Sequence, residues 1–212
     1  MKTPQSPPAG REYRLGRRKA QADKTRARLL AAARRILMTR EGLGTFGLES
    51  VARKAGVSRL TVYNQFGSRV GLLEALYDDL ARRGRIAEHL GEAFQLSDPQ
   101  AVLNAVVAAF TGFWRSERTV IRRLRSMAVL DPAFKGATGR DQRRVLAMRT
   151  ALLRLTAARG LSVARPDECA RILAMLTSFE TYDALAGADV DTARITSTVQ
   201  ELVRAAVEAA LR

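Results

Sequence analysis

The 212-residue sequence predicts an all-α protein, and two features of the chain carry this prediction. Apolar residues recur three or four positions apart through most of the chain, as they do on one face of a helix. Breaks that contain Gly or Pro, such as Asp98-Pro99 and Arg165-Pro166, separate the helical stretches. We find no internal repeat and no series of alternating apolar and polar residues that would predict a sheet.

The predicted helices follow one another with short breaks. The first, Asp23–Arg40, carries an apolar stripe and ends at the sequence EGLG, where glycine favours a helix terminus. Two short helices, Leu48–Ala55 and Ser58 to about Phe66, are separated by Gly56, and Ser58 is a suitable N-cap. A longer helix follows the cap Ser68. Further helices are expected at about 99–114, 117–129, 139–159, 166–186 and 190–211.

Charge is distributed unevenly along the chain, whose formal net charge is +15. Residues 1–85 contain 19 Lys and Arg against 7 Asp and Glu, whereas residues 86–212 contain 17 against 14. The basic excess of the N-terminal part indicates either a polyanionic partner there or a solvated basic face without a partner. The hydrophobic content of 47% is ordinary for a globular protein with a sizeable core.

The N-terminal segment and the cysteine content predict a cytoplasmic protein. Residues 1–22 are rich in Pro and then in Arg, and they lack the apolar stretch of a signal peptide, so we expect a flexible basic tail. The single cysteine, Cys169, permits no intramolecular disulfide and suits a reducing compartment. No apolar run approaches the length of a membrane span, so no membrane partner is expected.

The two short helices have the arrangement of a helix-turn-helix. Ala52 is small enough for close helix contact, and Gly56, four residues later, suits a tight turn. Val51, Val57 and Val62 are expected to point into the angle between the helices and hold it. The second helix would then present its outer face, which fits the major groove of DNA. An ordinary helical hairpin with a solvated polar face is the alternative.

The outer face of the second helix carries the candidate DNA contacts. Arg59 can reach the O6 and N7 atoms of guanine, Asn64 can read adenine or hold a phosphate, and Leu60 can touch a thymine methyl group. Thr61 and Tyr63 can hydrogen-bond to phosphates, which fixes the register of the protein on the duplex rather than the sequence that it reads.

Residues 24–76 contain the pattern Ala-Gly-Val-Ser-x-x-Thr-Val-Tyr-x-x-Phe, followed by Ser, a basic residue and a Leu-Leu pair. This segment, about a quarter of the chain, closely resembles the DNA-binding domain of the tetracycline-repressor (TetR) family of transcriptional regulators. The resemblance implies a three-helix DNA-binding domain at 23–70. It also implies a larger helical domain at 71–212 that binds a small-molecule effector and dimerises through its last two helices.

The function that the resemblance implies is that of a ligand-responsive repressor, bound as a homodimer to palindromic double-stranded operator DNA. Gln65 replaces a frequent His, which keeps the hydrogen-bonding capacity but removes any charge. Gly47 stands where many members have Ser or Thr, so it cannot supply a hydroxyl to a phosphate. By position in the motif, the DNA contacts transfer to Ser58, Arg59, Leu60, Thr61, Tyr63, Asn64, Gln65 and Arg69, the last in place of a phosphate-binding Lys.

The last two predicted helices, 166–186 and 190–211, have apolar faces that suit either an intrachain core or a dimer interface. The resemblance favours the dimer. Two recognition helices would then lie about 34–36 Å apart, one turn of DNA.

Aromatic and Met side chains are the candidates for a ligand pocket, because they suit an apolar, adaptable cavity. For each of them an ordinary place in the core is the alternative. Arg122, Arg123 and Arg125 could attract an acidic ligand, but a solvated helix face is the preferred interpretation. The pocket candidates are Phe110, Phe113, Trp114, Met127, Met148, Met175, Phe179 and Tyr182.

Groups that could carry catalysis or bind a metal are scarce. His89 is the only histidine and Cys169 the only thiol, and the chain lacks a Gly-rich phosphate loop, H-E-x-x-H and C-x-x-C. We therefore do not expect an enzyme, and we expect no metal site and no cofactor. A non-specific nucleoid protein or a membrane-surface adaptor would also use positive charge, but neither needs a recognition helix with this turn.

Overall fold

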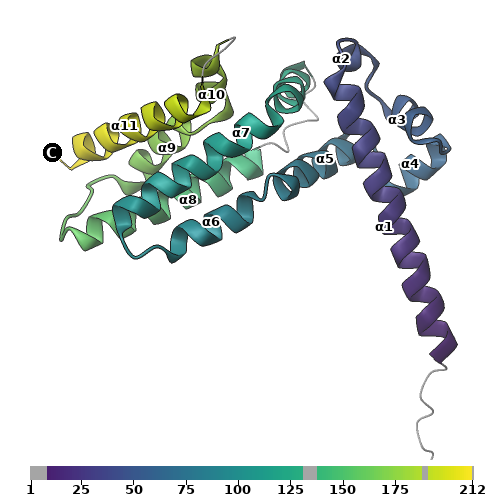
Figure 1. Cartoon of the computed structure of the whole chain (residues 1–212), viewed down its shortest axis with the longest axis horizontal. Helices are drawn as coiled ribbons and strands as arrows, with labels where there is room; N and C mark the ends of the chain where they lie inside the picture. Colours follow the sequence, from purple (N-terminus) through teal and green to yellow (C-terminus); the bar gives the residue numbers. More distant parts are fainter. Residues whose placement is uncertain (1–8, 131–137, 188–190, 212) are drawn as a thin grey trace, which may run out of the picture. The chain divides into compact units, whose positions relative to one another are not determined.

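The computed structural model describes residues 9–130, 138–187 and 191–211, and all the regular structure in these ranges is helical (Figure 1). The predicted all-α class is thereby confirmed. The chain divides into two compact units, Met1–Leu76 and Tyr77–Arg212, here called the N-terminal and the C-terminal unit. This division and the limit predicted after residue 70 both fall within one helix, α5 (Arg69–Arg83).

The N-terminal unit is built around one long helix. Its elements are α1 (Ala9–Met38), α2 (Gly42–Thr45), α3 (Leu48–Ala55), α4 (Arg59–Phe66) and the first half of α5. The apolar stripe of α1 packs against α3, and the first turns of α5 supply further leucines to the core. Among the described residues of this unit, the fully buried side chains are Leu29, Ala32, Ala33, Leu37, Val51, Val62, Leu72, Leu73 and Leu76.

Two features of this unit differ from the sequence-based expectation. Helix α1 begins at Ala9 rather than at Asp23, because residues 11–22 consist largely of Arg, Lys, Ala and Gln, which are good helix formers even without a core to pack on. The sequence EGLG is predicted only as a helix end, but its last three residues and Thr45 form the short helix α2. There a Cβ on Gly42 would lie 1.9 Å from the carbonyl oxygen of Ile36, so only glycine fits.

The C-terminal unit consists of packed helices that follow the second half of α5. Its closest contacts are those of α8 with α9, of α7 with α6 and α8, and of α11 with α7 and α9. In Figure 1 the long helices α7 and α8 lie side by side. The helices are α6 (Ile86–Gln95), α7 (Pro99–Leu130), α8 (Thr138–Ala158), α9 (Pro166–Leu176), α10 (Phe179–Ala186) and α11 (Thr192–Ala210).

Three breaks determine the path of this unit. Helix α7 loses helical geometry at Glu117 (φ −124°, ψ 17°), where two predicted helices adjoin. The predicted helix 166–186 is interrupted at Thr177. The carbonyl oxygen of Thr177 accepts a 2.9 Å hydrogen bond from the indole nitrogen of Trp114. Helix α5 ends at Gly84, where a Cβ would lie 2.5 Å from the Phe113 ring.

Helix α6 was not predicted from the sequence, although Ile86, Leu90 and Phe94 have helical spacing. It starts after Arg85, which adopts a left-handed conformation (φ 51°) that is uncommon for a residue with a side chain. No helix in the described ranges is long and apolar enough to cross a membrane.

An ion-pair cluster joins α7 to α10. Arg118 Nε donates a 2.7 Å hydrogen bond to Asp183 Oδ1, and Arg122 Nη2 donates one of 2.6 Å to the same oxygen. Burial by itself would raise the pKa of Asp183, but hydrogen bonds from Arg122 and Arg118 hold this pKa below its ordinary value. The cluster therefore stabilises the folded unit at neutral pH.

Candidate functional site

The turn between α3 and α4 has the geometry that the helix-turn-helix prediction requires. Gly56 adopts a left-handed conformation (φ 65°, ψ 42°), in which an L side chain is strained. The Gly56 N–H donates to the carbonyl oxygen of Arg53 at 3.2 Å, and the Val57 N–H donates to that of Ala52 at 3.0 Å. These bonds satisfy carbonyl groups that would otherwise lack partners at the end of α3.

The valines predicted to hold the angle between the helices are not equally buried. Val51 and Val62 are fully buried, as expected, whereas Val57 is only half-buried. Val62 lies in the middle of α4, so it anchors this eight-residue helix to the N-terminal unit. Such an anchor matters because an isolated helix of this length is unstable in water.

The start of α4 is capped by a side chain. The Ser58 hydroxyl accepts a 3.1 Å hydrogen bond from the Thr61 N–H and lies 2.9 Å from the Thr61 hydroxyl. The predicted N-cap is therefore confirmed. Two predicted DNA contacts, Ser58 and Thr61, thus also stabilise the first turn of the helix.

The remaining predicted contacts lie mostly on one open face of α4. Arg59, Leu60, Tyr63 and Asn64 are exposed, with 65% of Leu60 and 56% of Tyr63 accessible. Thr61 and Gln65 are half-buried, and so is Arg69 at the first position of α5. The structure thus brings the three candidate base contacts and the candidate phosphate contact Tyr63 together on the surface. We call Arg59, Leu60, Tyr63 and Asn64 the reading face.

The far end of α4 is held by Arg26 of α1, a residue that the sequence analysis missed. Its Nη1 atom donates a 3.0 Å hydrogen bond to the carbonyl oxygen of Gln65, and its guanidinium carbon lies 4.7 Å from the centre of the Phe66 ring. A cation at a helix C-terminus and over an aromatic ring is favourable on both counts. Arg26 lies outside the apolar stripe of α1, so no local pattern indicates this contact.

Serines begin the two helices that flank α4. The Ser50 hydroxyl accepts a 3.0 Å hydrogen bond from the Gly47 N–H, which closes the start of α3. The backbone of Gly47 is extended (φ −171°), so glycine is not required there for conformational reasons. At the start of α5 the Ser68 hydroxyl accepts a 3.0 Å hydrogen bond from the Gly71 N–H, which confirms the predicted cap.

The C-terminal unit contains a cavity of about 490 Å³ between α5, α6, α7 and α8. Three of the pocket candidates line it, namely Phe110, Phe113 and Trp114. Four others, Met127, Met148, Phe179 and Tyr182, are buried in the core outside the cavity wall, and Met175 lies exposed on α9. The sequence gives no way to separate wall from core, because both positions take the same residue types.

One end of this cavity is polar. The Tyr77 hydroxyl is buried and has no hydrogen-bond partner among the described residues. Burial raises the pKa of Tyr77 to about 12, so the phenol stays protonated at neutral pH. The Arg140 guanidinium lies 5.1 Å from the centre of its ring. Tyr77 and Arg140 were not among the predicted pocket residues.

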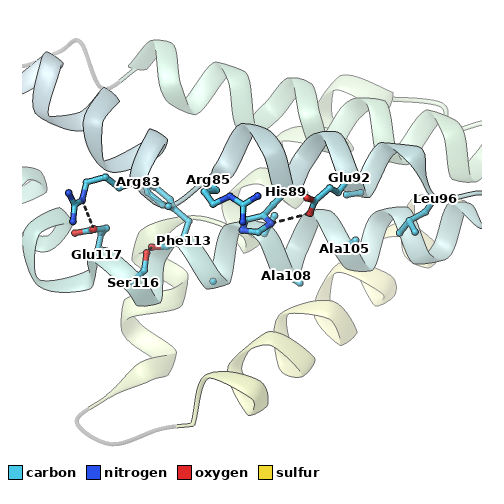
Figure 2. A pocket seen from close by; sticks show the side chains of 14 residues that line it. Arg83, Arg85, His89, Glu92, Leu96, Ala105, Ala108, Phe113, Ser116 and Glu117 are labelled. Carbon is cyan, nitrogen blue, oxygen red and sulfur yellow. Dashed lines mark hydrogen bonds and ion pairs between the residues drawn. The ribbon is translucent and has the colours of Figure 1, made fainter. Parts of the chain in front are cut away.

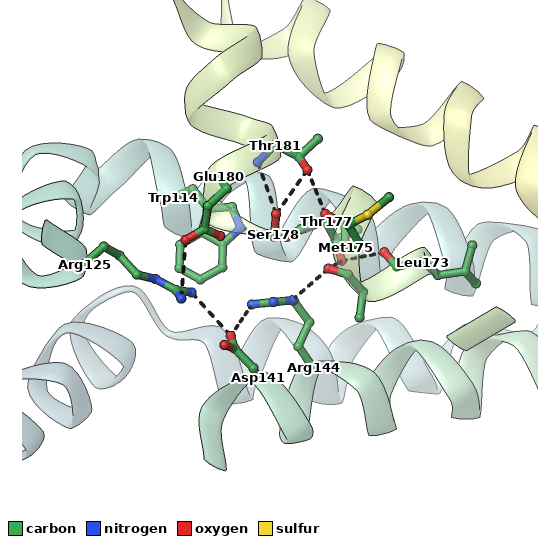
Figure 3. A network of polar contacts seen from close by, with 11 residues as sticks. Trp114, Arg125, Asp141, Arg144, Leu173, Met175, Thr177, Ser178, Glu180 and Thr181 are labelled. Carbon is green, nitrogen blue, oxygen red and sulfur yellow. Dashed lines mark hydrogen bonds and ion pairs between the residues drawn. The ribbon is translucent and has the colours of Figure 1, made fainter. Parts of the chain in front are cut away.

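The preferred interpretation of Arg125 as part of a solvated face is wrong, because this side chain lines the cavity and is only 23% exposed. Its Nη2 atom donates to Asp141 at 3.3 Å, and its Nη1 atom pairs with Glu180 at 3.4 Å (Figure 3). Asp141 also pairs with the buried Arg144 at 3.0 Å. Burial lowers the pKa of Arg144, so Asp141 compensates a desolvated charge.

A second hollow, of about 650 Å³, lies along α6 and α7 (Figure 2). Its floor consists mainly of alanine and glycine, and its charged groups already face one another. Arg83 Nε lies 4.0 Å from Glu117 Oε1, and His89 Nδ1 lies 3.3 Å from Glu92 Oε2. In the described ranges no three His, Cys, Asp or Glu residues are placed to hold a metal ion.

The apolar residues of the last helices divide between the core and the surface. Ile195, Val199 and Val203 of α11 are buried within the chain, as are Cys169 and Leu173 of α9. The large apolar side chains exposed on the same two helices are Ile172, Met175 and Leu202, which are 43%, 59% and 42% accessible. The structure therefore contains apolar residues that suit an intrachain core and others that suit a dimer interface.

Comparisons with known proteins agree with this geometry. A family model described as bacterial regulatory proteins of the tetR family matches residues 29–76, which contain α3 and α4. The HTH-type transcriptional regulator AlkX of Mycobacterium tuberculosis is 47% identical over 55 residues, which are 26% of either chain. This match therefore spans about a quarter of that relative.

Two further likenesses cover most of the chain. The HTH-type transcriptional regulator EthR of Mycolicibacterium smegmatis is 28% identical over 154 residues, which are 72% of this chain and 69% of that protein. The crystal structure of a TetR transcription regulator from Haloarcula marismortui superposes with a TM-score of 0.69 at 17% identity, over 90% of this chain and all of the other. At this identity the superposition shows a common fold.

Proposed function

The chain is a DNA-binding transcriptional regulator of the TetR family, and from this premise we propose that it is a ligand-responsive repressor. In this proposal it binds a palindromic operator as a homodimer and dissociates when a small molecule occupies the C-terminal unit. The observation that carries the proposal is the reading face, which is exposed on a helix that Val62, Ser58 and Arg26 hold in place. A preorganised helix loses little conformational entropy when it enters a groove.

The proposed contacts divide into base and phosphate contacts. Arg59 reads guanine, Leu60 touches a thymine methyl group, and Asn64 reads adenine or holds a phosphate. Tyr63 and Arg69 bind phosphates, to which Ser58, Thr61 and Gln65 add hydrogen bonds. The exposure of Arg59 and Leu60 supports this division, since a base contact requires a side chain that projects from the helix.

Dimerisation is proposed through α9 and α11, which pack against each other and expose Ile172, Met175 and Leu202. A two-fold interface uses the same patch on both copies, so this apolar face would meet its own copy. A dimer would place two reading faces on successive half-sites and combine two weak affinities.

The 490 Å³ cavity supports control by a ligand, since its size falls within the range of about 300–1,000 Å³ typical of small-molecule sites. Helix α5 carries both Tyr77, which lines this cavity, and Arg69, a proposed phosphate contact. A ligand can lower operator affinity only if it binds the DNA-free conformation more tightly than the DNA-bound one.

Selection of bound duplexes from a random pool tests DNA binding directly. We expect two inverted half-sites about 10 base pairs apart. Arg59→Ala should cost about 1–3 kcal/mol at one base position, whereas Arg69→Ala should weaken all sequences alike and reduce the slope of affinity against salt by about one unit. Equal affinity for every duplex, measured by fluorescence anisotropy, would refute sequence-specific binding.

The oligomeric state tests the proposed interface. Leu202→Glu places a charge on the exposed face of α11 and should convert dimers into monomers in sedimentation analysis. Leu146→Glu on α8 is the matched control, since Leu146 is also exposed but lies outside the proposed interface. The interface is wrong if both variants behave alike.

A further inference from the structure

The wall of the 490 Å³ cavity includes a tyrosine whose hydroxyl has no hydrogen-bond partner in the described ranges. Tyr77 lines the cavity, and its hydroxyl oxygen is buried with no partner among the described residues. Buried polar groups in folded proteins nearly always have a hydrogen-bond partner, so an isolated one marks a place where a ligand atom can supply it. The phenol stays protonated at neutral pH, so it can donate a hydrogen bond to an acceptor atom of a ligand.

The charges around the cavity favour a negative acceptor. Six arginines line the wall, and five carboxylates pair with five of them, which leaves a small positive surplus. Asp141 is shared between Arg125 and Arg144. Arg125 has a second partner in Glu180, whose side chain is 59% exposed, but its Nε atom is buried with no hydrogen-bond partner in the described chain. A cationic ligand would be repelled by this surplus, and an anion would reduce it.

The rest of the wall is apolar and partly aromatic. Phe110, Phe113 and Trp114 project from α7, and Ile86 and Leu90 from α6. The Trp114 indole nitrogen already donates to the Thr177 carbonyl oxygen, so its ring contributes apolar surface to the cavity. A ligand that fills this space therefore needs an apolar body in addition to its polar group.

We propose that the effector is an organic anion with an apolar, preferably aromatic, body and one carboxylate, which accepts a hydrogen bond from Tyr77 and lies beside Arg125. This inference rests on the proposed function and names the ligand class of its cavity. Arg140, which lies over the Tyr77 ring, adds a positive charge on the same side.

Calorimetry on the full-length chain tests the ligand class without DNA. The probes are phenylacetate, 4-phenylbutyrate, 2-naphthylacetate and decanoate, each with its primary amide, together with 2-naphthylethylamine. We expect at least one acid to bind, with an affinity about tenfold or more above that of its amide, and the amine to bind weakest. The proposal is overturned if an amide or the amine binds as tightly as the acids, or if no acid binds at about 1 mM.

Tyr77→Phe tests the residue assignment. The substitution removes only the unsatisfied hydroxyl, so the variant should fold at least as well as the wild type. We expect acid affinity to fall about tenfold while amide affinity changes less, since hydrogen bonds to charged groups are the stronger ones. Tyr182→Phe, at a buried tyrosine outside the cavity wall, is the control and should leave both affinities unchanged. Equal losses in the two variants would remove Tyr77 from the site.

Operator binding separates the two proposals. If an acid binds but leaves operator affinity unchanged, the ligand class stands and ligand control fails. If a neutral compound releases the operator while no acid binds, ligand control stands and the ligand class fails.

Discussion

The same local motif begins helix α4 and helix α10, but the two helices have different surroundings. The Ser58 hydroxyl accepts a 3.1 Å hydrogen bond from the Thr61 N–H and lies 2.9 Å from the Thr61 hydroxyl. The Ser178 hydroxyl accepts a 3.1 Å hydrogen bond from the Thr181 N–H and lies 3.1 Å from the Thr181 hydroxyl. Ser58 is exposed, whereas Ser178 is buried. A local sequence can thus determine where a helix begins, while the environment determines its role.

The contrast extends to the two units. In the N-terminal unit, caps and turns between residues 47 and 71 form the site from short-range hydrogen bonds. In the C-terminal unit, contacts between distant residues such as Trp114 and Thr177 determine the cavity and its neighbours. Matched substitutions in the two units can test how far this contrast holds.

The largest expected effect is the loss of a core leucine in either unit. Leu29 and Leu152 are both fully buried, so Leu29→Ala and Leu152→Ala should each lower the free energy of unfolding by about 2–5 kcal/mol. Amide hydrogen exchange should show the loss of protection mainly in the unit that carries the substitution. Equal loss in both units after either change would mean that they unfold together.

The next effect is backbone strain at two equivalent glycines. Gly56 and Gly160 both have φ of 65° at helix ends, and nothing lies within 4 Å of an added Cβ at either. Valine at either position should lower the free energy of unfolding by about 1–2 kcal/mol. Only Gly56→Val should also weaken operator binding in an anisotropy titration, because it redirects α4. A loss of operator binding in Gly160→Val of similar size would contradict this distinction.

Removal of either serine cap should change the free energy of unfolding by a smaller amount. Ser58→Ala should lower the free energy of unfolding by about 1 kcal/mol, a typical value for an N-cap. Ser178→Ala should cost up to about 2 kcal/mol, because it leaves the partly buried Thr181 N–H without its partner. Urea denaturation measures both. If the exposed cap proves the costlier one, burial does not set the difference.

The smallest effect concerns the pH dependence of the C-terminal unit. The pKa of Asp183 is lower in the folded chain than its ordinary value of 3.8, so its contribution to stability is present above that value and is lost as the pH falls through the folded pKa. Asp183→Asn should lower the free energy of unfolding by about 0.5–1 kcal/mol at pH 7. The difference from wild type should shrink in urea titrations towards pH 3. A difference that stays constant would exclude the ion pairs as its cause.

The sequence predicted the turn and the helix caps of the N-terminal unit well, because their determinants are close together in the chain. The hydrogen bonds around Gly56, Ser58 and Ser68 join groups at most five residues apart in the chain. The roles of these residues therefore follow from residue type and spacing. The Arg26 contact to Gln65 spans 39 residues and was missed. The predicted start of helix α1 is too late, because its first turns are helical without an apolar stripe.

The cavity was predicted less well, for a physical reason. Aromatic and Met residues fill cores and line pockets alike, so only packing separates Phe110 from Met148. The polar end depends on Tyr77, Arg125 and Asp141, which lie on three different helices. No periodicity in the sequence shows that these side chains meet.

The reading face has a consequence for how such a regulator can change over generations. Its four exposed side chains add little to folding, so exchanging them should alter stability by no more than about 0.5 kcal/mol each. Under the proposed function, a duplicated gene could therefore acquire a new promoter through a few codons while Val62 and Gly56 remain. Under the same proposal, a library randomised at Arg59, Leu60, Tyr63 and Asn64 is a practical source of regulators with chosen DNA sequences.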